Sequence, residues 1–529
     1  MNKILKKVDY RFIIITIIHF IITFFSDKNI FKFNDMNWLN YISCKILLLI
    51  ILFSFWQFIG KLIKKDKESH KYFKYFVIYM IPIIILFIFL YPGNWFGSDV
   101  YNFYDFATRG EFLYYLNYLS TVFYMIAYML FPIPPGAPFL TSILFGITFS
   151  YIAKSIYDIY KSKLIYLLLI PFFMFHTLLY TFYANRPIMF GVSYLLLISI
   201  IIIDKIKQNK LTTKKFISLA ILTGIVGYWR SESIYLVLAI PLFIFIVYKI
   251  KWNIKNIIKI FGICIISFIV ISLPQKIVEL KEKTDVPSSR NLPMYINPLS
   301  YMLTQELKGD NLEEDLNKIN NVLDISLMKE YASYEETFCI WLGGGCIKEY
   351  TTEEYEDFIT SYKNVMKNNF PLFIKTKILT FANASGIFID RFTTKDLYDS
   401  NDEYILKRED TKTLFGYEIR KALYAIIEGK NYYTNNPNIL WRMTNNLLIP
   451  LGIIGLIFIY SIIKKDLFYF LLTGMLLGHT FIVFITAPAS YFMYYFNVYM
   501  TGLVLGTIFI INYIYNKKNK KRRIVLWKK

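Results

Sequence analysis

The sequence predicts an all-α polytopic membrane protein with about twelve transmembrane helices and a mostly helical outer soluble domain between spans nine and ten. Three observations predict this fold. Hydrophobic residues make up 56% of the 529, apolar runs long enough to cross a bilayer recur along the chain, and lysine-rich connections separate them. The formal net charge of +21 would also suit a nucleic-acid-binding protein. Because the basic residues stand beside the apolar runs, we attribute the charge to membrane topology and expect no nucleic-acid partner.

The predicted spans are runs of about 16 to 22 mostly apolar residues. The first span follows three lysines, as the apolar part of a signal peptide does. No small-residue cleavage site follows it, so we expect a retained membrane anchor. The predicted spans lie at residues 10–25, 41–60, 75–91, 138–158, 164–182, 188–204, 216–230, 233–249, 257–273, 439–462, 467–487 and 492–513.

The lysine-rich connections set the predicted orientation. All of them face the cytoplasm if both termini are cytoplasmic. The apolar segment 112–131 would invert every later connection if it crossed the membrane, so we expect it to be an amphipathic or re-entrant helix at the outer interface. It then belongs to a long first outer loop at residues 92–137. The lysine-rich segments are 61–74, 161–163, 205–215, 251–259, 464–465 and 517–523.

The chain divides by composition into a membrane module at 1–273, an outer soluble domain at 274–438, and C-terminal spans with a basic tail at 439–529. Acidic clusters and turn-prone glycines replace long apolar runs in the middle part. Within it, segment 370–388 is expected to lie at the interface, with Lys375 and Lys377 reaching toward head groups. Cys339 and Cys346 flank the glycine-rich hairpin at 343–345, which makes them a candidate disulfide outside the cytoplasm.

Charged residues at the outer ends of the spans are the candidate functional residues, because charges at membrane depth are costly unless paired or solvated. A carboxylate suits proton abstraction from a hydroxyl, and the planar fork of arginine suits phosphate. Together they favour group transfer from a phosphate-linked donor. We predict Asp99 as the catalytic residue, and as substrate-binding residues Trp95, Asp105, Arg109, Asn185, Arg186, Arg230 and Glu232.

Each of these residues also has a structural interpretation. Asp99 could cap a helix at the membrane surface, and Arg186 could reach toward lipid head groups. Arg230 and Glu232 could neutralise each other across a tight turn. Asp105 and Arg109 could belong to a solvated helix face.

The four histidines stand apart from cysteines and paired carboxylates, which predicts no metal site made by the protein alone. A divalent cation that binds together with substrate is left open. The sequence carries no nucleotide phosphate loop, no dinucleotide fingerprint and no serine elbow. We therefore expect no certain cofactor.

The Tyr91-Pro92-Gly93 turn followed by Asp99 resembles the GT-C superfamily of integral-membrane glycosyltransferases, which take sugars from polyprenyl-phosphate carriers. The resemblance covers residues 75–249 in pattern and the outer domain only in placement. It implies a GT-C-like fold in which Asp99, on the first long outer loop, acts as the general base or positions the acceptor. The charged pair of the second outer loop corresponds to Asn185-Arg186, where this chain lacks the second acid.

The resemblance and the outer charges predict a glycosyltransferase in a bacterial cell membrane. It would move a sugar from a polyprenyl-phosphate-linked donor to a cell-surface glycan, polymer or glycolipid, with membrane lipid as a further partner. One alternative is a lipid-linked repeat-unit polysaccharide polymerase. A second alternative, a lipid-linked oligosaccharide flippase or transporter, predicts charges along the midplane of several spans. Here the charges gather at the outer edge.

Overall fold

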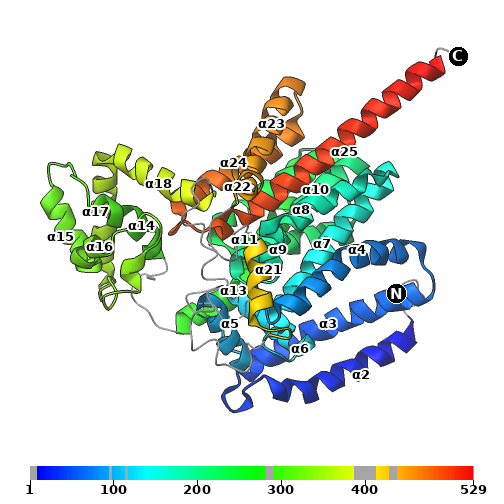
Figure 1. The fold of residues 1–529 in the computed structure, drawn as a ribbon, viewed down its shortest axis with the longest axis horizontal. Coiled ribbons are helices and arrows are strands. Elements are labelled where there is room, and N and C mark those ends of the chain that lie inside the picture. The colour runs from blue at the N-terminus through cyan, green and yellow to red at the C-terminus, as the bar shows by residue number, and fades with distance from the viewer. Residues whose placement is uncertain are drawn as a thin grey trace.

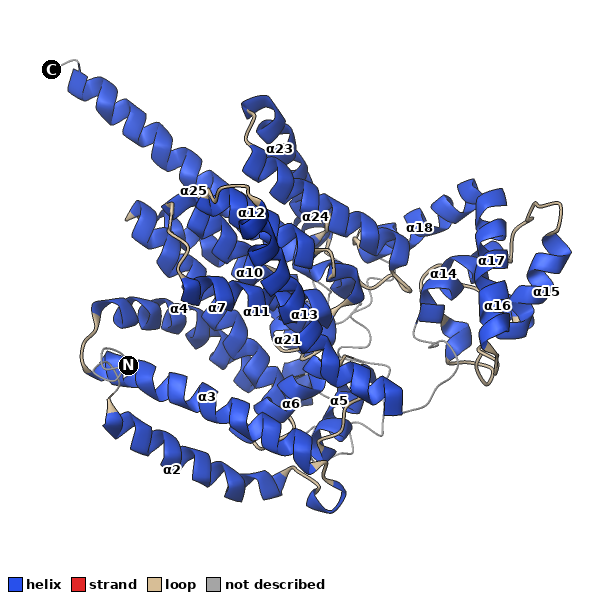
Figure 2. Cartoon of the chain, turned by 180° about the vertical axis from the view of Figure 1, so that it is seen from behind, coloured by secondary structure: helices blue, strands red, loops and turns tan. Residues whose placement is uncertain are grey.

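The computed structural model describes residues 9–93, 98–113, 117–281, 291–386, 413–427 and 438–527. Across these ranges the chain forms α-helices and short 3-10 helices, with an isolated β-bridge between Leu323 and Ile347 and no strand. Figure 2 shows helices throughout the described part of the chain. The predicted all-α class is confirmed.

Within the described ranges, nine helical segments are long and apolar enough to cross a bilayer. Because these segments run from one end of the chain to the other, the protein is a polytopic membrane protein. They are α2 (Tyr10–Ser26) with η1 (Asp27–Asn29), α3 (Trp38–Ile63), α4 (Lys67–Leu90), α7 (Gly136–Tyr160), α10 (Arg186–Lys207), η4 (Ser231–Ser233) with α12 (Leu236–Tyr248), α13 (Ile254–Lys281), α24 (Leu467–Thr486), and η8 (Phe492–Tyr495) with the first part of α25 (Phe496–Trp527).

The remaining three predicted spans are short or broken, so a count of twelve is not confirmed. Segment 164–182 forms η3 (Lys163–Leu168), α8 (Leu169–Phe173) and α9 (Phe175–Thr181), and the chain bends by 69° between α8 and α9. Counted as one span, this pair gives ten. The other two segments form α11 (Thr213–Trp229), and α22 (Ile439–Asn445) followed by α23 (Leu448–Lys464). At 17 residues each, α11 and α23 are about 26 Å long, less than the hydrocarbon thickness of about 30 Å.

Lysines end several of the long helices. Left-handed residues follow α3, α7, α10, α12 and α23, and all but one of them are lysines. A cation at this position is favourable because the C-terminal end of a helix carries partial negative charge. The sequence assigns all these helix ends to the cytoplasmic side. The left-handed residues are Lys65, Lys161, Gln208, Lys249 and Lys465.

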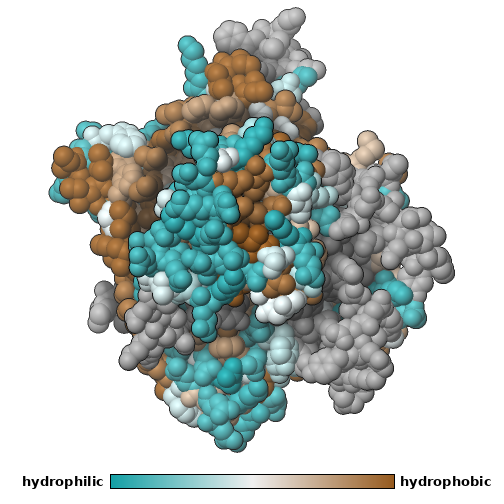
Figure 3. Space-filling model, turned by 90° about the vertical axis from the view of Figure 1, so that its left-hand side faces the viewer, coloured by the Kyte–Doolittle hydropathy of each residue, from teal (hydrophilic) through white to brown (hydrophobic). Residues whose placement is uncertain are grey.

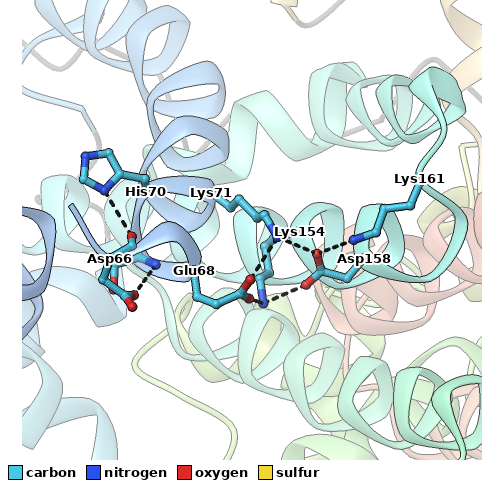
Figure 4. Close-up of polar contacts among 8 residues, drawn as sticks. Asp66, Glu68, His70, Lys71, Lys154, Asp158 and Lys161 are labelled. Atoms are coloured by element: carbon cyan, nitrogen blue, oxygen red, sulfur yellow. Dashed lines mark hydrogen bonds and ion pairs between the residues drawn. The ribbon is translucent and has the colours of Figure 1, made fainter.

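Ion pairs join α4 to α7 near the helix ends that carry these lysines (Figure 4). Lys154 forms ion pairs with both Glu68 and Asp158, and its Nζ lies 2.8 Å from Asp158 Oδ2. Lys71 also contacts both acids, at 2.9 and 3.4 Å, and Lys161 contacts Asp158 at 3.2 Å. Lys154 is buried, so the network fastens two spans and does not form a purely solvated face.

The predicted first outer loop carries α5 (Ser98–Arg109) and α6 (Tyr118–Leu130). With 13 residues, α6 is about 20 Å long, too short to cross a bilayer, which agrees with the prediction that segment 112–131 does not span. The helix does not lie on a surface, however. It packs against α3, α5 and α7 with most of its side chains buried. Residues 114–116 of the segment lie outside the described residues.

The domain that the sequence predicts to lie outside, named the outer domain below, is helical and has its own hydrophobic core, separate from that of the membrane module. Figure 1 shows it on the left, and the face that it turns to the viewer in Figure 3 carries many hydrophilic residues. The start of α2 and the end of α25 lie on the opposite side in Figure 1. The domain comprises α14 (Leu292–Met302), α15 (Leu312–Val322), α16 (Ile325–Glu330), η6 (Phe338–Ile340), α17 (Thr352–Asn368) and α18 (Phe370–Ala384).

Two expectations for the region 274–438 need correction. Helix α21 (Tyr417–Ile427) packs against α4 and α9 and so belongs with the membrane module. On α18, Lys375 is exposed, as an interfacial helix requires, but Lys377 is fully buried. Its side chain therefore does not reach toward head groups.

Candidate functional site

Tyr494 lies where the sequence-predicted charges converge. Its phenol is within electrostatic range of Arg230, Asp99, Arg186 and Glu232. These residues come from separate elements: Asp99 from the start of α5, Arg186 from the start of α10, Arg230 and Glu232 from the turn between α11 and α12, and Tyr494 from η8. The fold thus brings together charges that are up to 133 residues apart in the sequence (232 minus 99).

Arg230 is hydrogen-bonded on one side and, within the described part of the chain, has a buried donor without a partner on the other. Its Nε donates to Glu232 Oε2 at 3.3 Å, and its Nη2 donates to Glu232 Oε1. The guanidinium stands over the Tyr494 ring, with 5.2 Å between Cζ and the ring centroid. Arg230 is only 8% exposed, and its Nη1 has no hydrogen-bond partner among the described residues. The ion-pair interpretation therefore holds for one arm of the fork, while the other arm can donate to a ligand.

Asp99 lies in the first turn of α5, where the positive end of the helix favours a carboxylate. Its charge also reaches Tyr124 of α6. The Tyr124 hydroxyl donates to the Ala184 carbonyl at 2.6 Å, which ties α6 to the segment before α10. Trp95, the other predicted site residue near Asp99, lies outside the described residues.

Asn185 positions the start of α10, so its contribution to the site is indirect and differs from the predicted contact with substrate. Its Oδ1 accepts from the Arg186 backbone N–H at 2.6 Å and so caps the helix. Its Nδ2 donates to the Tyr183 hydroxyl at 2.8 Å and lies 3.7 Å from Met493 Sδ, next to Tyr494. Asn185 is 2% exposed, so its polar atoms serve the protein itself. Its cap fixes the start of the helix from which Arg186 extends.

The turn before Asp99 is fixed from three directions. Gly93 has φ of +73°, a conformation that side chains rarely adopt. A Cβ added there would lie 3.1 Å from both the Phe182 carbonyl oxygen and Pro138 Cβ. From α21, Arg420 Nη2 donates to the Gly93 carbonyl at 3.2 Å. Sequence reasoning missed Arg420 because it lies far along the chain, in a segment assigned to the outer domain.

Asp105 and Arg109 serve a structural network at the other end of α5. They lie six and ten residues after Asp99, or about 9 and 15 Å along the helix axis. Asp105 accepts from Lys32 at 2.9 Å and from Arg109 at 2.7 Å, and Arg109 contacts Glu111 at 3.1 Å. Burial alone would raise the pKa of the Asp105 carboxyl, but Lys32 and Arg109 hold this pKa below its ordinary value. The network joins α5 to the connection between α2 and α3, which favours the structural interpretation of both residues.

His479 lies close to the Arg230–Glu232 pair, inside the membrane module. It is 1% exposed, and its ring centroid lies 5.7 Å from those of Tyr194 and Tyr235. The Tyr194 and Tyr235 hydroxyls are 3.2 Å apart. His479 therefore packs among aromatic rings inside the module. Neither His479 nor Tyr494 carries a sequence signal that distinguishes it from other aromatic residues of the spans.

Cys339 and Cys346 lie side by side in the outer domain. Their sulfur atoms are 2.8 Å apart, and the Cys346 backbone N–H donates to the Cys339 carbonyl at 2.8 Å. Both residues are buried thiols in this structure. The geometry supports them as a candidate pair, and their oxidation remains a prediction. Across the described ranges, no three histidine, cysteine or acidic side chains come together as metal ligands.

No family model, no curated protein and no solved structure matches this chain. The functional argument therefore depends on the geometry and charges of the site.

Proposed function

We propose that the chain is a membrane glycosyltransferase that moves a sugar from a polyprenyl-phosphate carrier to a cell-surface glycan, polymer or glycolipid. The observation that carries this proposal is the convergence of two carboxylates and two arginines on Tyr494, at ends of helices that the sequence predicts to face outside. A lipid-linked sugar phosphate presents its head group at this depth. The chemistry of the side chains matches the three tasks of the transfer: to activate a hydroxyl, to hold a phosphate and to keep both in place.

In the proposed reaction, a hydroxyl oxygen of the acceptor attacks the anomeric carbon of the donor sugar. The bond between that carbon and the phosphate oxygen breaks, and the polyprenyl phosphate leaves with the electron pair. Asp99 accepts the hydroxyl proton as general base. The unpaired Nη1 of Arg230, together with Arg186, stabilises the negative charge of the leaving phosphate. Glu232 accepts from the other two donors of Arg230 and so orients the guanidinium.

Substitution of Asp99 by asparagine tests this role. The amide keeps the size of the side chain but cannot take a proton, so we expect transfer to fall by on the order of a hundredfold or more. The measurement is transfer from a panel of polyprenyl-phosphate sugars by purified protein in lipid nanodiscs. Asp105→Asn on the same helix is the matched control and is expected to stay within a fewfold of wild type.

Near-normal transfer by Asp99→Asn would remove Asp99 from the mechanism. The length of the product separates the proposed function from its same-side alternative. A single added sugar supports the glycosyltransferase, whereas a ladder of repeat units would indicate the polymerase. The identities of the sugar and the acceptor are to be determined with the same panel of polyprenyl-phosphate sugars.

A further inference from the structure

Lys377 is a fully buried lysine at the junction between the outer domain and the membrane module. It lies on α18, and its Nζ donates to Asn297 Oδ1 at 3.2 Å and to the Ala487 carbonyl at 3.0 Å. The first partner belongs to α14, and the second to the connection between α24 and η8. Among the described residues no carboxylate forms an ion pair with Lys377, so two neutral oxygens are its partners.

A buried amine without a counter-charge is costly, because the charged form loses its water. Burial lowers the pKa of Lys377 to about 7. Methionine has nearly the same length and would fill the space without this cost. Lys375 stands two residues earlier on an exposed face of the same helix. The hydrogen bonds of Lys377, rather than its bulk, therefore account for a lysine at this position.

The connection at residues 487–491 is held at two points by the outer domain. Lys377 holds its beginning through the Ala487 carbonyl. Near its end, the Ser490 backbone N–H and hydroxyl donate to the Glu335 carbonyl at 2.7 and 3.0 Å. The next element is η8, which carries Tyr494 beneath the Arg230 guanidinium. The outer domain thus forms hydrogen bonds with the chain four residues before the tyrosine at the centre of the candidate site (494 minus 490).

We propose that Lys377 is a positioning residue, through which the outer domain fixes the connection 487–491 and thereby places Tyr494 against Arg230. This inference deepens the proposed function and rests on it for the effect on transfer, but not for the effect on the connection itself. The amine acts through the backbone of the connection, at a distance from the reacting atoms. Loss of its hydrogen bonds should loosen the segment that leads to Tyr494 while the helices on either side stay folded.

The test compares Lys377→Met with Lys375→Met in the full-length chain in nanodiscs. Hydrogen exchange measured by mass spectrometry reports on residues 487–495 directly. Loss of the hydrogen bond to Ala487 should make this segment exchange roughly five- to tenfold faster in Lys377→Met. Lys375→Met should exchange like the wild type. In transfer assays, Lys377→Met should raise the KM for the lipid-linked donor more than it lowers kcat, because Arg230 and Tyr494 face the donor phosphate.

Unchanged exchange at 487–495 in Lys377→Met would overturn the inference, whatever happens to transfer. Faster exchange in that segment, in a protein whose wild type transfers no sugar from any donor, would support the positioning role and refute the proposed function instead. If Lys377→Met does not yield a monodisperse protein, Lys377→Gln carries the test. The shorter, neutral side chain lacks the amine that donates to the Ala487 carbonyl, and unchanged exchange at 487–495 in that variant would equally overturn the inference.

Discussion

Arg230 shows how one side chain can be both a structural and a binding group. Two of its nitrogens donate to Glu232. The third, Nη1, is buried beside Tyr494 without a hydrogen-bond partner among the described residues. A buried donor without a partner costs free energy, so a ligand that accepts from it gains more than an exposed arginine would offer. A lipid phosphate at the outer membrane surface is such a ligand.

Replacement of Arg230 by lysine should weaken donor binding. Lysine keeps the charge but loses the planar fork, in which separate nitrogens face Glu232 and the phosphate, so the paired geometry is lost. We expect the affinity for polyprenyl phosphate to fall by roughly tenfold, or about 1.4 kcal/mol. The measurement is binding to purified variants in nanodiscs at fixed salt, with Arg109→Lys as control. Equal binding by Arg230→Lys and wild type would leave Arg230 as an ion-pair partner of Glu232 alone.

At the residue scale, the sequence could place charges along the chain but could not assign their partners. Asp99, Arg186, Arg230 and Glu232 were predictable because charge beside an apolar span is costly and therefore conspicuous. Asp105 and Arg109 looked similar, and only the fold shows that they pair with Lys32 and Glu111. Tyr494 and Lys377 were not predictable as site residues, since their roles come from contacts between distant segments.

At the element scale, hydropathy predicts apolar helices well and their continuity poorly. It does not register the 69° bend between α8 and α9, or the interruption between α22 and α23. The positive-inside pattern correctly kept α6 from being counted as a span. That helix is nevertheless buried between other helices, because its aromatic side chains pack on α3, α5 and α7.

The docking of α18 should depend on pH through Lys377. Burial lowers the pKa of this lysine from 10.5 to about 7. Between these values the native chain binds fewer protons at Lys377 than the unfolded chain does, so raising the pH stabilises the native state. The gain is complete above about 10.5 and is lost as the pH falls to about 7. Asn297 Oδ1 and the Ala487 carbonyl face the amine, while the Glu335 carboxylate accepts from Asn383 at 3.2 Å.

Thermal unfolding of the wild type between pH 7 and pH 9 should therefore show a steeper rise in stability than that of Lys377→Met. The difference in slope should be at most about 1.4 kcal/mol per pH unit. Lys375→Met should follow the wild type, because that lysine is exposed. Identical slopes in wild type and Lys377→Met would show that this amine does not titrate with a lowered pKa.

At the scale of the whole molecule, the site lies where a helical outer domain meets a bundle of membrane spans. The membrane module supplies the charges, and the outer domain holds the connection that leads to Tyr494. The sequence predicted both bodies from the change in composition at residue 274, but it placed α21 in the wrong one. The amphipathic pattern of α21 is equally suited to a soluble helix and to a helix that covers a membrane module. Only its contacts with α4 and α9 assign it to the membrane module.

The central claim is that Arg186, Arg230 and Tyr494 surround the phosphate of a polyprenyl carrier, with Asp99 facing the acceptor. A cryo-electron-microscopy structure of the full chain in nanodiscs with bound polyprenyl phosphate tests it most directly. We predict density for the phosphate within hydrogen-bonding distance of Arg230 Nη1 and close to the Tyr494 hydroxyl, with the Asp99 carboxylate open toward the acceptor. A phosphate bound instead at the lysine-rich end of the bundle, or a site around Tyr494 that stays empty at saturating lipid, would contradict the claim.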